Sequence, residues 1–506
     1  MNVWHVSILH LTAVLVAFSP GLGLDKAVVA QQSPFDTEQG VEVLTRGPVH
    51  EAFAGTVTFD PQPGIVVSQG PPEPIEEMPP DLRPEGINVT WIPGYWGWDD
   101  DRSGYLWVSG IWRALPPGRE WVPGYWGRFG QGIQWTSGYW ADATISEIEY
   151  LPEPPPTVEV GPNIAAPSPD YGWVPGSWVW HQGRYAWRPG YWITVQPDWL
   201  WMPTHYVWTP RGYVFVDGYW DYSVGRRGVL FAPVYMDAAV YTRRGFIYSP
   251  RTVIDLRVFS DHLFLRPQYS HYYFGDYYAP SYRSGGFFAS FSFNSSRHGY
   301  DPIYAHQRWE HRQDRDWEHR VQADYRHRRD HEDARPPRTL KVQITRGTSG
   351  MSSREKSVEI ARPFTQLATR KDSALRFQPV VQEERQQIVR RGQEITKFRQ
   401  ERSRLESTAV DPSAQQTSRK FQPSKVRTTR SPIVAKPVEQ LGKGQAPPKR
   451  HEAPRPDPKV EPRSRRTGGT ARPSREETGV KKDEPVKKTK AVSKDHGKDD
   501  HKPKKK

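Results

Sequence analysis

The chain has 506 residues with 49 Pro, 41 Gly and no Cys, and its mean hydropathy is −0.77. The lack of Cys excludes disulfides, thiolate metal sites, a Cys nucleophile and a cysteine-linked lipid anchor among these residues. An apolar share of 36% is too low for a chain packed throughout, yet all 21 Trp lie at or before Trp317, so the core must lie in that part.

The N-terminus predicts an export signal. An apolar segment spans residues 6–18, a Pro20–Gly21 break follows, and Val28–Val29–Ala30 gives a small-residue ending. The apolar segment is shorter than the roughly 20 residues that a membrane span requires. We therefore expect residues 1–30 to be a cleaved secretory signal peptide, and the protein to reach the periplasm, cell envelope or exterior. An uncleaved anchor is the alternative, because no Lys or Arg precedes the apolar segment.

A repeat of the form W-x-x-G-x-W dominates the middle of the chain. Its first position recurs in steps of 16, 14 and 14 residues in one block and 14, 14 and 14 in the next. Thr204 and Tyr206 replace the Gly and second Trp of one copy, and Phe215 the first Trp of another. Such regularity indicates an internal structural repeat. The residues that define it are Trp91, Gly94, Trp96, Trp107, Gly110, Trp112, Trp121, Gly124, Trp126, Trp135, Gly138, Trp140, Trp173, Gly176, Trp178, Trp187, Gly190, Trp192, Gly218 and Trp220.

A period of 14 residues suits two strands and two turns. Pro-Gly pairs such as Pro175–Gly176 fit the central positions of a type II turn, where Gly takes φ > 0. Trp178 and Trp180, like Tyr185 and Trp187, occupy alternate positions, which predicts an antiparallel hairpin with these rings on one face. We therefore predict a mainly β fold of antiparallel β-meander or hairpin repeats, followed by helical segments and a long disordered basic tail.

Composition and pattern divide the chain into nine segments. Further strands are expected at 228–233, 245–250 and 254–265, and apolar residues seven apart at Val381, Ile388 and Ile395 predict a helix. The segments are a signal peptide (1–30), a Pro-rich extended arm (31–86), a first repeat block (87–150), a Pro-rich connector (151–170), a second repeat block with additional strands (171–265), an aromatic, Ser- and Gly-rich covering loop (266–300), a charged His- and Arg-rich helix (301–335), a mostly flexible region with one helix near 380–407 (336–410), and a disordered basic tail (411–506).

The repeat resembles the YXWGXW, or WXXGXW, repeat proteins, an exported bacterial family without an assigned function. The motifs that carry the resemblance are WIPGYWGWDDD at 91–101, WVSGIW at 107–112, WVPGYW at 121–126, WVPGSW at 173–178 and WRPGYW at 187–192. The segments at 215–222, 227–235 and 266–282 also look like parts of longer members. The resemblance covers roughly residues 35–330, implies export, and assigns no activity and no site residue.

The repeated aromatics have two interpretations. Exposed rings along a sheet stack on sugars, whereas buried rings supply the core of a small sheet. Every copy places its aromatics at the same positions, as a structural repeat requires, so core is the favoured interpretation. A carbohydrate-binding Trp face remains the alternative.

Polar motifs give little support for a metal site or for catalysis. Asp99–Asp100–Asp101 offers hard oxygen ligands but lacks the spacing of a calcium loop, so a solvated turn is favoured. His311, His319 and His327, eight apart, drift around a helix and do not converge on one metal; His331 follows them. Asp217 and Asp221 are four residues apart, without any argument for their separation in space. We expect no enzyme activity, no cofactor and no metal.

The basic charge is concentrated at the C-terminal end. Residues 441–506 hold 21 Lys and Arg against 10 Asp and Glu, a net charge of +11 out of +13 for the whole chain. Such a segment binds anionic polymers or membrane surfaces electrostatically, and its lack of aromatic residues argues against base stacking. We therefore expect a non-enzymatic structural or interaction protein of the bacterial cell envelope, with anionic envelope polymers or glycans as partners. A nucleic-acid-binding protein is the further alternative, which requires the export prediction to be wrong.

Overall fold

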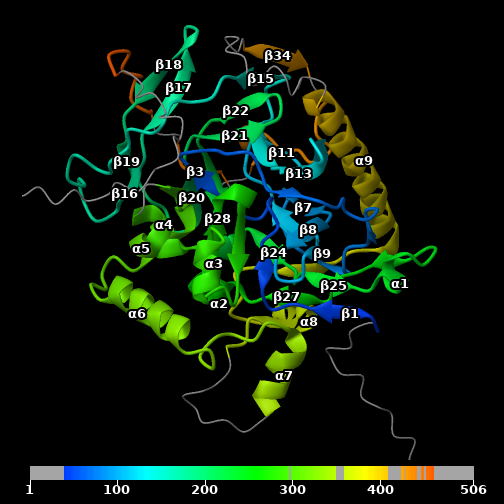
Figure 1. The fold of residues 1–506 in the computed structure, drawn as a ribbon. Coiled ribbons are helices and arrows are strands. Elements are labelled where there is room, and N and C mark those ends of the chain that lie inside the picture. Colours follow the sequence, from blue (N-terminus) through cyan, green and yellow to red (C-terminus); the bar gives the residue numbers. More distant parts are fainter. Residues whose placement is uncertain are drawn as a thin grey trace, which may run out of the picture. The chain divides into compact units, whose positions relative to one another are not determined.

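The computed structural model describes residues 39–295, 298–348, 358–407, 423–427, 429–441, 446–449 and 452–460 (Figure 1). All the described residues belong to one compact unit within Met1–Arg463. The predicted signal peptide and residues 461–506 of the predicted tail lie outside the described residues.

The repeats form four long antiparallel hairpins, which confirms the predicted mainly β fold. Two successive motifs make one hairpin. An inner pair of strands flanks the hairpin turn, and an outer pair lies at the open end. The strands are β7 (Val89–Ile92), β8 (Tyr95–Asp99), β9 (Gly104–Val108) and β10 (Ile111–Ala114); β11 (Arg119–Val122), β12 (Tyr125–Phe129), β13 (Gly132–Thr136) and β14 (Tyr139–Asp142); β16 (Tyr171–Val174), β17 (Ser177–His181), β18 (Arg184–Arg188) and β19 (Tyr191–Thr194); β20 (Trp199–Met202), β21 (His205–Thr209), β22 (Gly212–Val216) and β23 (Tyr219–Tyr222).

The predicted type II turns at the Pro-Gly pairs are wrong. Gly94, Gly124, Gly176 and Gly190 do not take positive φ. The chain continues through each pair between an outer strand and an inner strand of the same hairpin, so it does not reverse direction there. Reversal occurs at the hairpin tips, as at Gly183, where φ is 77°.

The segment predicted as an extended arm is part of the core. Val49, Ala52 and Phe53 are fully buried, and short strands of this segment pair with strands far along the chain. The prediction failed because these strands are too short to show a pattern, and distant partners complete them. They are β1 (Val41–Val43), β2 (Gly47–Pro48), β3 (Val57–Thr58), β4 (Val66–Val67), β5 (Glu76–Glu77) and β6 (Leu82–Pro84).

The segment 266–300 is not a covering loop, because it begins within a buried hairpin. Tyr269, Tyr272 and Phe274 are fully buried, and β28 and β29 lie between β2 and β30 in a four-stranded sheet. The strand expected at 254–265 is likewise wrong, since a short helix interrupts it. The elements after the repeats are η1 (Val224–Arg226), β24 (Gly228–Leu230), β25 (Val234–Met236), α1 (Ala238–Tyr241), β26 (Ile247–Tyr248), β27 (Thr252–Ile254), α2 (Leu256–Phe259), η2 (Ser260–His262), β28 (Leu263–Arg266), η3 (Pro267–Tyr269), β29 (His271–Phe274), α3 (Pro280–Ser284), β30 (Phe288–Ala289), α4 (Ser290–Ser295) and β31 (Gly299–Tyr300).

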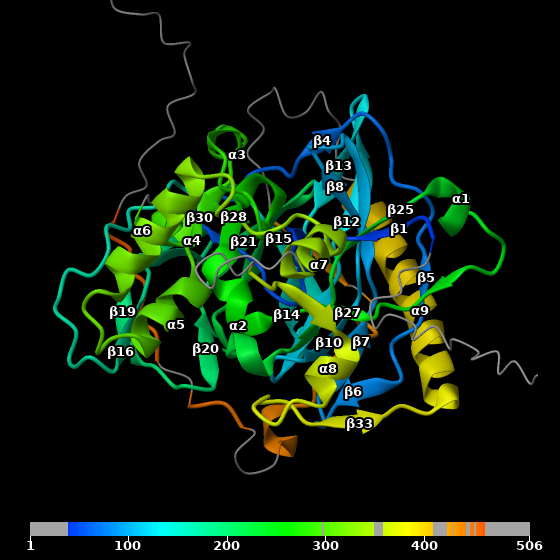
Figure 2. The same cartoon turned by 90° about the horizontal axis from the view of Figure 1, so that it is seen from below.

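Two helices replace the single charged helix expected at 301–335. α5 (Pro302–Glu310) is capped by Asp301, whose carboxylate accepts from the N–H groups of Ile303 and Tyr304, and α6 (Trp317–Asp330) follows. The helix expected near 380–407 is confirmed as α9 (Gln382–Ser407), which packs against β12 and β5 (Figures 1 and 2). None of the helices in the described part of the chain is both long and apolar enough to cross a membrane.

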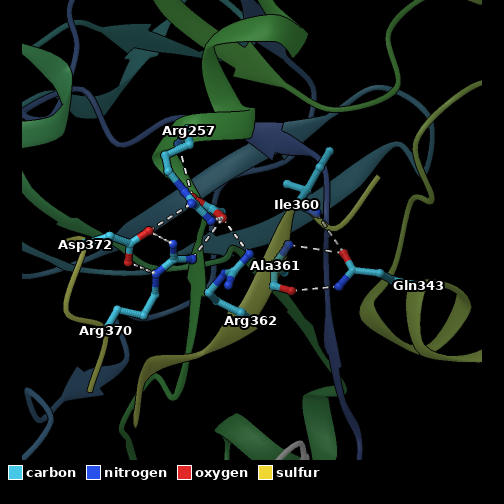
Figure 3. A network of polar contacts seen from close by, with 8 residues as sticks. Arg257, Gln343, Ile360, Ala361, Arg362, Arg370 and Asp372 are labelled. Atoms are coloured by element: carbon cyan, nitrogen blue, oxygen red, sulfur yellow. Dashed lines mark hydrogen bonds and ion pairs between the residues drawn. The ribbon is translucent and has the colours of Figure 1, made fainter. Parts of the chain in front are cut away.

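A polar network orders the described part of the region 336–410 that was expected to be mostly flexible (Figure 3). Gln343 donates to the carbonyl of Ala361 and accepts from the N–H groups of Ile360 and Ala361. Arg362 and Arg257 both bind Asp255, at 2.5 and 2.9 Å. These side-chain contacts join distant segments, so local pattern does not predict them. The elements here are α7 (Leu340–Thr348), β32 (Ala361–Pro363), α8 (Phe364–Ala368) and β33 (Phe377–Pro379).

Part of the predicted disordered tail is paired with the repeat region. β34 (Ser424–Arg427) adds to β15 (Glu147–Leu151) beside the fourth hairpin, in the order β21-β22-β15-β34. Ile433 is buried, η4 (Val438–Gln440) follows, and the N–H of Asp457 donates to the carbonyl of Trp187 at 2.7 Å. The expectation of disorder is therefore wrong for these described stretches.

Candidate functional site

The motif tryptophans face one another across the strands of each hairpin. In every pairing the first aromatic of one motif lies opposite the last aromatic of the other, and the Trp–Trp ring centroids are 5.1–5.3 Å apart. Most pairs are edge-to-face, the geometry that the charge distribution of aromatic rings favours. The pairs are Trp91–Trp112, Trp96–Trp107, Trp121–Trp140, Trp126–Trp135, Trp173–Trp192, Trp178–Trp187, Trp201–Trp220 and Tyr206–Phe215.

Most of these rings are core, and a few are partly exposed. Trp91, Trp107, Trp112 and Trp135 are among the largest side chains that are fully buried. Half-buried rings occur at Trp126, Trp173 and Trp192. The aromatic surface open to a ligand is therefore small and is confined to particular copies of the motif.

The motif glycines make room for the tryptophan of the partner motif. A Cβ at Gly190 would lie closer than 3.0 Å to the indole of Trp173, and one at Gly176 would meet Trp187 in the same way. In a hairpin whose two motifs both have Gly and Trp, each glycine makes room for the first Trp of the other motif, because an approximate twofold axis relates the two motifs. The residues are Gly94 with Trp107, Gly110 with Trp91, Gly124 with Trp135, Gly138 with Trp121, Gly176 with Trp187, Gly190 with Trp173 and Gly218 with Trp201.

A carboxylate from outside the hairpin caps three of the four motif pairs. Glu77 accepts from the N–H groups of Gly94 and Gly110 at 2.8 and 2.9 Å, and from Trp107 Nε1 at 3.0 Å. Glu51 and Glu159 bind the second and third hairpins through a Trp Nε1 and a motif Gly N–H. These carboxylates satisfy N–H groups that strand pairing leaves open, and they attach the preceding Pro-rich segments to the repeats.

Burial raises the pKa of two capping carboxyls despite these hydrogen bonds. Desolvation is the largest cause, and it raises the pKa of Glu77 to about 7 and that of Glu51 to about 8.

The cap of the fourth hairpin differs, because its carboxylate comes from within the hairpin: Gly218 N–H donates to Asp217 at 2.9 Å.

The acidic and histidine motifs do not form a metal site. Asp100 pairs with Arg266 at 2.5 Å, Asp101 pairs with Arg46, and Asp99 accepts from Tyr235, so the turn is held by ion pairs and is not merely solvated. His311 follows α5 and stacks edge-on against Trp317, whereas His319 and His327 lie on α6, and His331 packs on His327. Among the described residues, no group of three or more His, Asp or Glu side chains is placed to hold a metal ion.

Asp217 and Asp221 have separate roles. Asp221 is buried and pairs with two buried arginines, Arg113 of β10 at 2.6 Å and Arg227 at 3.0 Å. These arginines also donate to the carbonyls of Ala52 and Phe53. The cluster therefore joins the first hairpin, the fourth hairpin and the N-terminal segment.

A cavity that adjoins the repeats lies against α9, and we call it the α9 cavity. It has a volume of about 460 Å³, within the range of small-molecule sites. Aromatic residues of β8, β9, β12 and β13 form one wall, residues of α9 form another, and a Pro-rich stretch closes a side. The lining includes Pro71, Pro72, Glu73, Pro74, Tyr95, Trp96, Trp107, Tyr125, Trp126, Trp135, Thr396, Arg399, Gln400, Ser403 and Arg404.

One face of α9 attaches the helix to the repeats. Ile395, Arg402 and Glu406 are buried. Arg402 donates to the carbonyls of Pro123 and Ser137 at 2.8 and 3.0 Å and pairs with Glu406 at 3.1 Å. These contacts of Arg402 Nε and Nη1 fix this face of α9 against the repeats.

The caps and the α9 cavity were missed by sequence reasoning. An acidic residue within a Pro-rich stretch just before a motif pair, as at Glu77 and Glu159, is the signal that would have indicated a cap. For α9 the signal is Arg402, which continues the seven-residue spacing of Ile388 and Ile395 with a charged residue. A charge in an apolar register indicates a buried polar contact.

A comparison with protein families matches the repeats. The family model described as "WXXGXW repeat (2 copies)" matches residues 86–113, 102–127, 169–192 and 197–221. These ranges include the motifs from Trp91 to Trp126 and from Trp173 to Trp220. No curated protein and no solved structure matches the chain.

Proposed function

Because the chain carries the WXXGXW repeat across residues 86–221, we propose that it is a non-enzymatic structural and interaction protein of the bacterial cell envelope. The repeats serve as a rigid scaffold, and anionic envelope polymers are the partners. The observation that carries this proposal is the burial of the motif aromatics. Their rings pair with each other across strands, which leaves few of them for a ligand.

Charge supports the choice of partner. Residues 464–506 hold 15 Lys and Arg against 7 Asp and Glu, a net charge of +8. A segment of this charge binds polyanions through release of their counterions, so its affinity falls steeply with salt. Because the sequence predicts an export signal, we expect this polymer to belong to the envelope. Nucleic acid is the less favoured partner.

Deletion of residues 464–506 tests the partner. We expect the shortened protein to keep the thermal melt of the parent, since all the described contacts lie before residue 464, and to lose most of its salt-sensitive retention on polygalacturonate beads. Neutral dextran beads are the control. Retention that the deletion leaves unchanged at low salt would assign binding to the repeat unit instead.

The same proposal requires export. Cell fractionation, combined with N-terminal sequencing of the mature protein, should find it outside the cytoplasm with Gln31 close to its first residue. An intact Met1 form in the cytosol would contradict the envelope location and favour the nucleic-acid alternative.

Carbohydrate binding by the repeats themselves is the second candidate. It is favoured by the half-buried rings of Trp126, Trp173 and Trp192 and by the aromatic wall of the α9 cavity. Aromatic side chains at such positions stack on sugar rings.

A further inference from the structure

Arg399 is a cation without a partner in the wall of the α9 cavity. No hydrogen bond or ion pair joins its guanidinium to any described residue, and its Nε is buried without a hydrogen-bond acceptor. Arg402, three residues later on the same helix, makes hydrogen bonds to two carbonyls and to Glu406. Arg399 is half-buried, and a guanidinium Nε that is buried without an acceptor is unfavourable, so the contrast between the two arginines needs a reason.

The groups near Arg399 do not supply the missing negative charge. Glu51 interacts with Arg399 only through space, and its pKa of about 8 leaves its carboxyl largely protonated at neutral pH. Burial lowers the pKa of His50 and of His271 to about 3, so both rings are neutral. The hydroxyl of Tyr95, which lines the cavity, is 2.7 Å from His271 Nε2. The inner end of the cavity therefore carries one positive charge.

Apart from the exposed charged side chains of Glu73 and Arg404, the remaining lining fits a hydroxylated ring. Trp126 offers a half-buried indole, and Thr396, Gln400 and Ser403 of α9 offer neutral hydrogen-bonding groups. Aromatic faces hold the apolar face of a sugar, hydroxyl and amide groups bind its hydroxyls, and a guanidinium forms paired hydrogen bonds with a carboxylate. A flat aromatic acid would leave the polar groups of α9 unused.

We propose that the α9 cavity binds an acidic sugar unit, with its carboxylate on Arg399 and its ring against Trp126. This inference rests on the proposed function, because the polymer at the envelope supplies the sugar. It assigns the selective contact to the repeat unit, separate from the basic residues 464–506.

The test compares two small sugars on the full chain by ligand-observed NMR titration. Methyl glucuronoside and methyl glucoside differ only in the carboxylate. Because neither sugar is a polyanion, their binding does not measure the electrostatic binding of a polyelectrolyte. We expect the glucuronoside to bind at least about tenfold more tightly, the ratio that a hydrogen bond to a charged group gives. Arg399→Gln should remove that preference and leave the weak binding of the glucoside unchanged.

Two further variants keep the outcome interpretable. Arg390→Gln is the matched control, because Arg390 is an exposed arginine of α9 that does not line the cavity. It should change affinity less than about twofold. Arg399→Gln should melt no lower than the parent, because it removes a half-buried cation that makes no ion pair, whereas Arg402→Gln should melt lower because Arg402 is buried and paired.

Equal binding of the two sugars, or a preference that survives Arg399→Gln, would overturn the inference. Absence of binding by either sugar would do the same. Retention on polygalacturonate that is lost with residues 464–506 would still stand in those cases, so failure of the cavity and failure of the proposed function are distinguishable.

Discussion

At the scale of single residues, steric fit determines which residues the motif contains. Its glycine is required because an indole from the partner motif occupies the volume where a Cβ would lie. The two motifs of a hairpin impose this requirement on each other, so Trp and Gly recur together. The same close approach explains Thr204, which replaces the motif glycine in one copy. That copy faces Phe215, which replaces the first Trp of its partner motif.

Gly190→Ala should therefore destabilise the protein through a clash. The new methyl group would overlap the indole of Trp173, and overpacking of this kind costs about 1–3 kcal/mol. Gly225→Ala is the matched control, because its Cβ would meet no atom within 4 Å and its φ is not positive. Urea unfolding followed by Trp fluorescence measures both. If the two variants lost stability equally, the spatial explanation would be wrong.

At the scale of elements, Pro-rich segments act as straps on the hairpins. The straps that carry Glu77 and Glu159 each also accept an indole N–H with a main-chain carbonyl: Trp96 donates to Glu73 at 3.0 Å, and Trp178 to Pro156 at 3.0 Å. The straps therefore complete hydrogen bonds that the hairpins cannot make alone.

The hairpins could be predicted from the sequence, whereas the straps could not. Alternation and a period of 14 residues are local, so they predicted the antiparallel hairpin that carries Trp178 and Trp187, which the structure confirms. A strap has no period, and its strands have two or three residues that gain partners only in the folded chain, as Glu76–Glu77 does with β26. The α9 cavity could not be predicted either, because residues near 71, 126 and 399, far apart in the sequence, form it together.

The cap at Glu77 predicts a dependence of stability on pH. Its pKa is about 7 in the folded protein against 4.5 without burial, so the folded state holds the proton more tightly. The stability that this group contributes is full below pH 4.5 and is lost as the pH rises through about 7, a change of roughly 3 kcal/mol. Glu77→Gln should remove this part of the pH dependence.

Urea unfolding of the parent and of Glu77→Gln between these pH values measures the effect. The parent should take up close to one more proton on folding than the variant does. Glu76→Gln is the control, because it removes an exposed carboxyl from the same strand and should follow the parent. Parallel curves for the parent and Glu77→Gln would show that the cap is already ionised in the folded state.

At the scale of the whole molecule, the two repeat blocks belong to one compact unit. Asp221 of the second block pairs with Arg113 of the first, and Arg227 and the carbonyls of Ala52 and Phe53 complete the cluster. A buried ion pair of this kind contributes little compared with an apolar replacement, yet its disruption is costly because it leaves charges buried and unpaired.

Asp221→Asn should therefore destabilise both blocks together. The loss should be about 3–5 kcal/mol, since two buried arginines lose their shared carboxylate. Asp198→Asn is the control, because Asp198 makes an exposed pair with Arg226, and such pairs contribute at most about 1 kcal/mol. Thermal unfolding should be followed in parallel by Trp fluorescence and by far-ultraviolet circular dichroism. A single transition that moves down with both probes is expected, because the cluster ties the first hairpin to the fourth. Two separated transitions in the parent would show that the blocks unfold independently and that the cluster does not couple them.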